Sequence, residues 1–187
     1  METPGSLLER LKQPNEQQAW TRFVQLYTPL LYDWARRVGV QEPDAADLVQ
    51  DVFTVLVRKL PEFHYDQSKS FRGWLRTVLL NRWRDRATKR PVLVTMAPDN
   101  LLASLPAPEV AADFEEREYR NYLVERSLQL LQAEFPDLTW KAFSLYVLNG
   151  QAATEVASQL QVSVNVVYLA KSRVLGRLRH ELTGLLD

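Results

Sequence analysis

The stretch Ser70–Arg90, SFRGWLRTVLLNRWRDRATKR, combines a helical apolar pattern with concentrated positive charge. It holds seven Arg or Lys and a single Asp, in a chain whose formal net charge is zero. At 100° per residue, one helical face carries Phe71, Trp74, Leu75 and Val78. A second stripe beside it, called the basic stripe below, carries Arg72, Arg76, Leu79, Trp83, Arg86 and Arg90. The first face is expected to pack on a core. The second offers charge for phosphates and an indole for stacking on bases.

A solvated cationic helix face is the simpler interpretation of this stretch. Such a face, however, more often mixes both signs at i,i+4 than excludes acids. The rest of the chain is divided into charge blocks as well. Residues 67–90 carry eight basic groups and one acidic group, whereas residues 91–137 carry three basic and nine acidic groups. These blocks predict two macromolecular partners, or one basic surface shielded by an acidic segment.

The composition sets limits on the class of protein. The 187 residues are 46% hydrophobic, which is enough for one ordinary domain or two small ones. There is no cysteine, which excludes disulfides and thiolate metal sites and suits a reducing cytosol. Two histidines, His64 and His180, are too few for an imidazole-rich metal centre. No apolar run approaches the roughly 18 residues of a membrane span, and no secretory signal is evident. We expect a cytoplasmic protein with no cofactor, no metal, no membrane contact and no small-molecule substrate.

The spacing of apolar residues predicts helix almost throughout the chain. Asn15 is expected to cap a helix that runs to Gly39, and Pro29 should kink or divide it. Pro43 and Asp44 should open the next helix. Pro61 ends that helix, and Ser70 is expected to cap the basic one.

Periodicity is lost between Val92 and Pro108, where prolines and Asp99–Asn100 mark a linker. Helices are expected to resume near Asp113. The predicted fold class is all-α, with two small helical domains joined by a linker. The expected boundaries are 1–91 for the first domain, 92–112 for the linker and 113–187 for the second domain.

The second domain carries the pattern of a helix-turn-helix. A short helix, Ala153–Leu160, is followed by the turn Gln161–Val164 and a long helix that reaches Leu182. Small Ala157 at the crossing allows the two helices to approach at a steep angle. Outward positions on the second helix would meet base edges and phosphates in a major groove. An ordinary αα-hairpin could show the same pattern.

Taken together, three segments resemble bacterial RNA polymerase sigma factors of the extracytoplasmic-function group, within the sigma-70 family. DAADLVQDVFTVLVRKLPEF, residues 44–63, is similar to regions 2.1–2.2, and Ser70–Arg90 is similar to regions 2.3–2.4. GQAATEVASQLQVSVNVVYLAKSRVLGRLRHEL, residues 150–182, is similar to region 4.2. The second domain departs from the family at Tyr168–Ala170, where Lys-Ser-Arg is often present, and at Gln161, where the turn usually has Gly.

The resemblance implies a protein that directs core RNA polymerase to specific promoters and assists promoter melting. The implied partners are the β′ clamp helices and β flap of polymerase, promoter DNA and an anti-sigma factor. The implied polymerase-binding residues, called the acidic face below, are Asp47, Gln50, Asp51 and Thr54. The implied minus-10 DNA-binding residues are Tyr65, Arg72, Arg76, Asn81, Arg82, Trp83, Arg86 and Arg90. The implied minus-35 DNA-binding residues are Ser163, Asn165, Val166, Tyr168, Leu169, Ser172, Arg173 and Arg177.

Three other functions remain as alternatives. A helix-turn-helix regulator would bind duplex DNA independently of polymerase, but it leaves the basic stripe unexplained. A helical adaptor would use the basic helix to bind an acidic protein. An enzyme would use carboxylates such as Asp44, Asp47 and Asp51. No His or Cys partner, Gly-rich loop or metal-ligand spacing accompanies them, so we do not expect catalysis.

Overall fold

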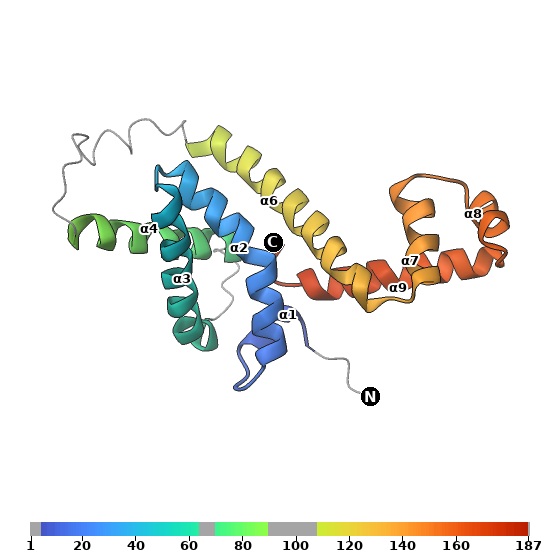
Figure 1. Ribbon diagram of the computed structural model, residues 1–187, viewed down its shortest axis with the longest axis horizontal. Helices are drawn as coiled ribbons and strands as arrows, with labels where there is room; N and C mark the ends of the chain where they lie inside the picture. The colour runs from blue at the N-terminus through green and yellow to red at the C-terminus, as the bar shows by residue number, and fades with distance from the viewer. Residues whose placement is uncertain (1–4, 64–69, 90–107, 187) are drawn as a thin grey trace.

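The computed structural model describes residues 5–63, 70–89 and 108–186, and helices make up most of these ranges (Figure 1). No β-strand occurs in the described ranges, which confirms the predicted all-α class. Within the same ranges, none of the helices combines the length and apolar character that crossing a lipid bilayer requires.

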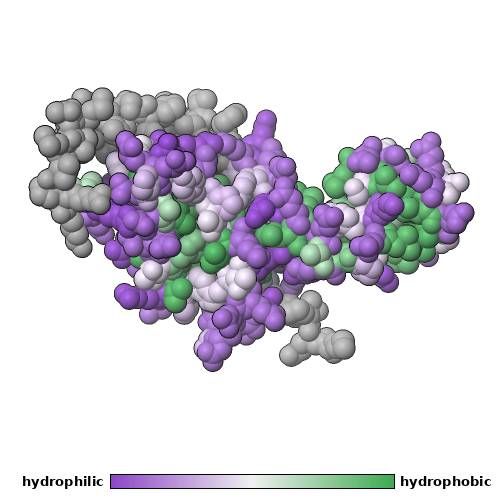
Figure 2. Space-filling view, viewed as in Figure 1, coloured by the Kyte–Doolittle hydropathy of each residue, from purple (hydrophilic) through white to green (hydrophobic). Residues whose placement is uncertain are grey.

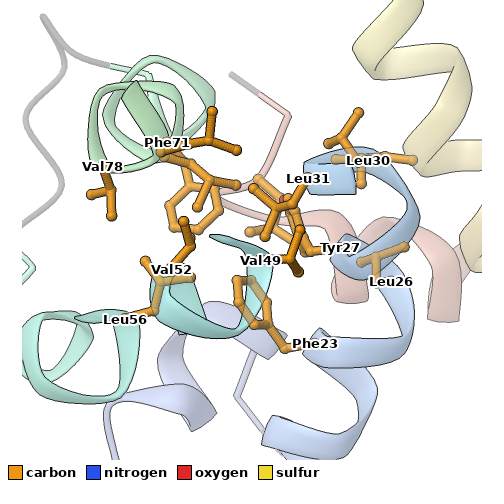
Figure 3. Close-up of a cluster of buried hydrophobic side chains, with 14 of the residues drawn as sticks. Phe23, Leu26, Tyr27, Leu30, Leu31, Val49, Val52, Leu56, Phe71 and Val78 are labelled. Carbon is orange, nitrogen blue, oxygen red and sulfur yellow. The ribbon is translucent and has the colours of Figure 1, made fainter. Parts of the chain in front are cut away.

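Four helices form an N-terminal bundle: α1 (Leu7–Leu11), α2 (Gln17–Arg37), α3 (Glu42–Lys59) and α4 (Phe71–Lys89). Its centre is aromatic, with Phe23 and Tyr27 of α2 facing Phe71 of α4 (Figure 3). The Phe71 ring lies 6.2 Å from that of Phe23 and 5.8 Å from that of Tyr27, both near edge-to-face. Val52 and Leu56 of α3 complete this cluster with no exposed surface. The first face of the basic stretch therefore packs on a core, as its spacing predicts.

The start of α4 and the start of α2 differ in how well the sequence predicts them. Ser70 caps α4 as expected, because its Oγ accepts a hydrogen bond from the Gly73 amide at 3.1 Å. The prediction that Asn15 caps α2 is wrong. Asn15 adopts a left-handed φ of 68°, and its carbonyl accepts a hydrogen bond from the Gln17 amide at 2.9 Å. Asn15 thus closes the turn before the helix, which Asn tolerates better than most residues.

Pro29 does not divide α2, which continues from Gln17 to Arg37. A proline removes the hydrogen bond to the carbonyl four residues earlier, here that of Gln25. That carbonyl accepts a hydrogen bond from Arg126 Nε at 3.3 Å, and the neighbouring Leu26 carbonyl accepts one from Tyr122 Oη at 2.8 Å. The partners come from another helix, which is why the local sequence pattern does not predict the outcome.

Helix α6 (Pro108–Leu131) begins five residues before the expected start at Asp113, so the linker prediction of 92–112 is too long at its end. Residues 92–107 lie outside the described residues. Helix α6 packs on the N-terminal bundle, where Tyr119 Oη lies 2.8 Å from Tyr27 Oη. The Arg37 guanidinium also pairs with Glu118 and lowers the pKa of that carboxyl. A lowered carboxyl pKa contributes stability above its unfolded-state value, and this contribution is lost as the pH falls through the folded value.

The C-terminal lobe begins after the short turn η2 (Gln132–Glu134) and contains α7 (Asp137–Phe143), the π-helical turn η3 (Ser144–Leu148), α8 (Ala153–Leu160) and α9 (Val164–Leu182). Its core joins Phe143 of α7, Val156 of α8 and Val167 and Val174 of α9, none of which is exposed. Ala157 is 5% exposed in this core. The predicted helix-turn-helix packing is therefore confirmed.

Gln161 at the end of α8 has the left-handed angles φ 54° and ψ 43°. This conformation costs a non-glycine residue about 1 kcal/mol. We expect Gln161→Gly to raise the free energy of unfolding by about 1 kcal/mol in urea denaturation. Gln159→Gly inside α8 is the control, and it should lower stability by about 1 kcal/mol. A loss of stability in both variants would contradict the left-handed conformation of Gln161.

Candidate nucleic-acid interface

The basic stripe lies along the flank of α4 where the buried face passes into the exposed one. Leu79 is only 1% exposed and belongs to the core, so its assignment to the exposed stripe is wrong. Trp83 is half-buried and packs against the same core, as Trp74 does. Arg72 and Arg76, nearer the start of the helix, are also half-buried. The amphipathic pattern predicts which side of the helix carries the stripe, but it does not predict how deeply each side chain is buried.

The remaining predicted residues of α4 lie at its exposed end. Asn81 is exposed, and Arg82 NH1 lies 3.5 Å from Asp85 Oδ2, one turn away. Arg84 is exposed on the same turn and was not among the predicted site residues. Tyr65 and Arg90 lie outside the described residues.

Arg86 of α4 forms an ion pair with Asp51 of α3. The Nε and NH2 atoms of Arg86 each lie 2.7 Å from Asp51 Oδ2, and NH1 lies 3.4 Å from the Asp44 carbonyl. The pair joins one residue predicted to bind DNA to one predicted to bind polymerase. Their side chains are 34% and 47% exposed, so the pair contributes at most about 1 kcal/mol to stability. It was missed because 35 residues separate its members.

The other three residues of the acidic face are exposed on α3. Asp47, Gln50 and Thr54 follow at steps of three and four residues, which places them on one side of the helix. Thr54 Oγ1 donates a hydrogen bond to the Gln50 carbonyl at 3.0 Å. The structure therefore brings a carboxylate, an amide and a hydroxyl together next to the ion pair between α3 and α4.

The beginning of α9 presents most of the predicted minus-35 residues to solvent. The exposed ones are Ser163, Asn165, Tyr168, Leu169, Ser172 and Arg173, and Val166 is half-buried. Tyr168 and Leu169 are 50% and 44% exposed, which is unusual for large apolar side chains. This surface lies at the far end of the molecule from α4 (Figure 1), in a lobe where apolar residues reach the surface (Figure 2).

Tyr146 on η3 supports this exposed surface and was not predicted. Its ring meets that of Tyr168 edge-to-face at 5.7 Å, and Lys171 Nζ lies 5.4 Å from its centroid. The two contacts hold two side chains of α9 from outside the helix. No local motif marks Tyr146, because its partners are on a different element.

Arg177 does not join the exposed surface of α9. Its Nε lies 3.2 Å from Glu134 Oε2, and its NH1 lies 3.0 Å from Glu181 Oε2. These contacts place Arg177 where α9 meets the N-terminal bundle. Among the described residues, no group of three or more His, Cys, Asp or Glu is placed to hold a metal ion.

The comparisons with known proteins identify the family of this chain. Residues 23–91, which include α3 and α4, match the family model described as Sigma-70 region 2. The chain is 33% identical over 188 residues to the RNA polymerase sigma factor NccH of Alcaligenes xylosoxydans xylosoxydans, covering 96% of this chain and 93% of NccH. The chain belongs to the sigma-70 family. Within it, the chain belongs to the extracytoplasmic-function group, which confirms the resemblance inferred from its three segments.

Two further matches are to one sigma factor, CnrH. This chain is 29% identical over 174 residues to the RNA polymerase sigma factor CnrH of Cupriavidus metallidurans, and the match covers 91% of this chain and 88% of CnrH. A solved structure of CnrH in complex with the cytosolic domain of CnrY shares 24% identity with it. That match covers 92% of each chain, with a TM-score of 0.38.

Proposed function

We propose that this sigma factor directs core RNA polymerase to specific promoters and assists melting of the DNA there, as a cytoplasmic, non-enzymatic protein without a cofactor. The observation that carries the proposal is the edge shared by α3 and α4. There the acidic face and the basic stripe lie side by side, joined by the Asp51–Arg86 pair. The adjacency supports a protein that binds polymerase with one helix and DNA with the next.

The basic stripe of α4 is proposed to bind the unpaired strand of the minus-10 element. Arg72 and Arg76 supply charge for the phosphates, and the partly accessible indole of Trp83 supplies a surface on which a base can stack. Base stacking on an aromatic side chain contributes about 1–3 kcal/mol and tolerates different bases. Melted DNA fits this combination better than duplex DNA does, because a duplex keeps its bases stacked on each other.

The exposed start of α9 is proposed to bind the minus-35 element as a duplex. Tyr168 and Leu169 offer apolar contact to thymine methyl groups in the major groove, and Arg173 offers charge to a phosphate. Tyr146, through its contacts with Tyr168 and Lys171, is proposed to hold this surface in place.

The proposed protein partners are those of the family. The acidic face on α3 would bind the β′ clamp helices, and the C-terminal lobe would meet the β flap. CnrH, to which this chain is similar, has a solved complex with the cytosolic domain of CnrY. An anti-sigma factor is the third proposed protein partner, as the resemblance to the family implies.

Run-off transcription with purified core polymerase on a promoter library tests the proposal. We expect start sites that core enzyme alone does not give. Specific duplex binding by the protein without polymerase, together with no new start sites, would instead favour an independent helix-turn-helix regulator.

A charge swap separates the two roles of Asp51. Asp51→Arg alone and Arg86→Glu alone each place like charges opposite one another, and each should weaken polymerase binding and lower stability by about 1 kcal/mol. The double variant restores the ion pair, so its stability should return to the wild-type value. If Asp51 also contacts polymerase, the double variant should still bind core enzyme about tenfold more weakly, measured by fluorescence anisotropy. Full recovery of polymerase binding would limit Asp51 to pairing with Arg86.

A further inference from the structure

Helix α1 and the lysine that follows it carry none of the proposed contacts with polymerase or DNA. The helix lies outside residues 23–91, the part of the chain that matches the family model. Its three leucines are nevertheless no more than 5% exposed and join the core of the N-terminal bundle. The Ser6 amide donates to Glu9 Oε2 at 2.9 Å, and the Glu9 amide donates to Ser6 Oγ at 3.4 Å. The buried face and this capping box hold Lys12, at the end of α1, in a defined place on the bundle.

The ammonium of Lys12 lies over the ring of Phe63, which follows the 3₁₀ turn η1 (Leu60–Glu62) after α3. Lys12 Nζ is 5.7 Å from the ring centroid, within the roughly 6 Å at which a cation is attracted to an aromatic face. The Phe63 ring lies 4.6 Å from the Trp74 ring and 5.7 Å from the Phe71 ring. Because Phe71 has no exposed surface, these contacts connect the ammonium to the core.

The contact with Trp74 places this cation and its rings on the flank of α4 opposite the basic stripe. At 100° per residue, Trp74 is about 160° around the helix from both Arg72 and Arg76. The exposed ridge between the two flanks carries Gly73 and Thr77. Gly73 adds no side chain to the ridge, so a strand of DNA can pass close to the helix there.

The groups on this flank suit a strand that has left the duplex. Lys12, Phe63 and Trp74 are each half-buried, so part of each side chain is open to solvent. The accessible part of the Trp74 indole can stack on an unpaired base, and the N–H groups of the Lys12 ammonium can donate to the phosphate beside that base. A lysine already held against a ring loses less side-chain freedom on binding than one that moves in solvent.

We propose that Lys12 binds a phosphate of the melted strand on this flank of α4, and that Phe63 positions its ammonium for the contact. The inference rests on the proposed function, because only a protein that binds the unpaired minus-10 strand has a phosphate to place there. The DNA-binding surface then includes a residue outside the part of the chain that matches the family model. The strand crosses the ridge of α4 at Gly73 instead of running along one side of the helix.

Binding of a single-stranded probe at several salt concentrations tests the contact. The probe is the non-template minus-10 strand of a promoter found by run-off transcription, and its binding to holoenzyme is measured by fluorescence anisotropy. Lys12→Met keeps an unbranched side chain but removes the charge. We expect about tenfold weaker binding of the probe and a logarithmic salt dependence less steep by about 0.7. Lys12→Arg should keep both values near those of wild type, because a guanidinium also binds a ring face and a phosphate.

Two further measurements show that the effect belongs to DNA binding at this position. Lys59→Met, the same change at an exposed position of α3, should leave the salt dependence unchanged. Lys12→Met should bind core polymerase within about twofold of wild type.

Phe63→Leu tests the positioning role of the ring. The change keeps most of the apolar volume but removes the aromatic face that holds the ammonium. With Phe63→Leu in place, adding Lys12→Met should weaken probe binding by no more than about threefold instead of tenfold, because the two residues act as one unit. Effects of the two changes that multiply in full would overturn the role of Phe63.

The salt dependence separates a contact with phosphate from a structural role of Lys12. Weaker probe binding by Lys12→Met with an unchanged salt dependence would overturn the contact, and so would no change in either value. An equal change in Lys59→Met would overturn it as well, since net charge alone would then explain the effect. Loss of core binding by Lys12→Met would place Lys12 on polymerase instead of DNA. A wild-type holoenzyme that binds the probe no more tightly than core polymerase does would refute the proposed binding of the minus-10 strand itself.

Discussion

The double variant Arg72→Ala/Arg76→Ala is expected to bind promoter DNA about 100-fold more weakly in complex with polymerase. Each arginine is proposed to make a charged contact with a phosphate, which contributes about 1.5 kcal/mol or more. The logarithmic salt dependence of binding should also become less steep by about 1.4, since each contact with single-stranded DNA contributes about 0.7. Promoter binding by the holoenzyme at several salt concentrations measures both effects.

Alanine is the residue most compatible with a helix, so α4 should keep its structure in this variant. Binding to core polymerase is therefore expected to stay within about twofold of wild type. Arg58→Ala/Lys59→Ala is the matched control, because it removes two exposed cations from the end of α3, outside the basic stripe. If the control and the stripe variant lose the same affinity and the same salt dependence, the stripe has no special contact with DNA.

Phe71→Ala is expected to lower the free energy of unfolding by about 4 kcal/mol. Phe71 has no exposed surface, and its ring lies between 5.7 and 6.2 Å from four other aromatic rings. Its removal leaves a cavity at the point where α4 is held against α2. Urea denaturation followed by circular dichroism measures the loss.

Phe71→Leu is the control for this site. It keeps most of the apolar volume and should lower stability by only about 1–1.5 kcal/mol. A loss below 1 kcal/mol in Phe71→Ala would mean that α4 is not anchored through this residue. The basic stripe would then lack the rigid support that the structure gives it.

The sequence predicts those parts of the molecule that depend on neighbours along the chain. The Ser70 cap, the apolar face of α4 and the packing of α8 on α9 all follow from dihedral preferences and from spacings of three and four residues. The burial of Leu79 does not follow from these preferences and spacings. It sits at the border of the apolar face, and the neighbouring helices decide how far that face is covered.

The other features depend on contacts between distant segments. The partners Arg86 and Asp51 are 35 residues apart, and Arg22 and Glu181 are 159 residues apart. The Gln25 carbonyl next to Pro29 is satisfied by Arg126, 101 residues later. Periodicity gives no information about such pairs. Asp51, Arg86 and Arg177 of the predicted site therefore have partners that only the folded chain brings within reach.

Helix α9 contributes Val167 and Val174 to one hydrophobic core and Leu178 and Leu182 to the other. A rigid helix shared in this way couples the melting of the two halves of the protein. The protein should therefore give one calorimetric transition, and a destabilising substitution in either half should lower its single melting temperature. A substitution that detaches the end of α9 from its core should remove this coupling. Each half should then unfold at its own melting temperature, and calorimetry should show two transitions.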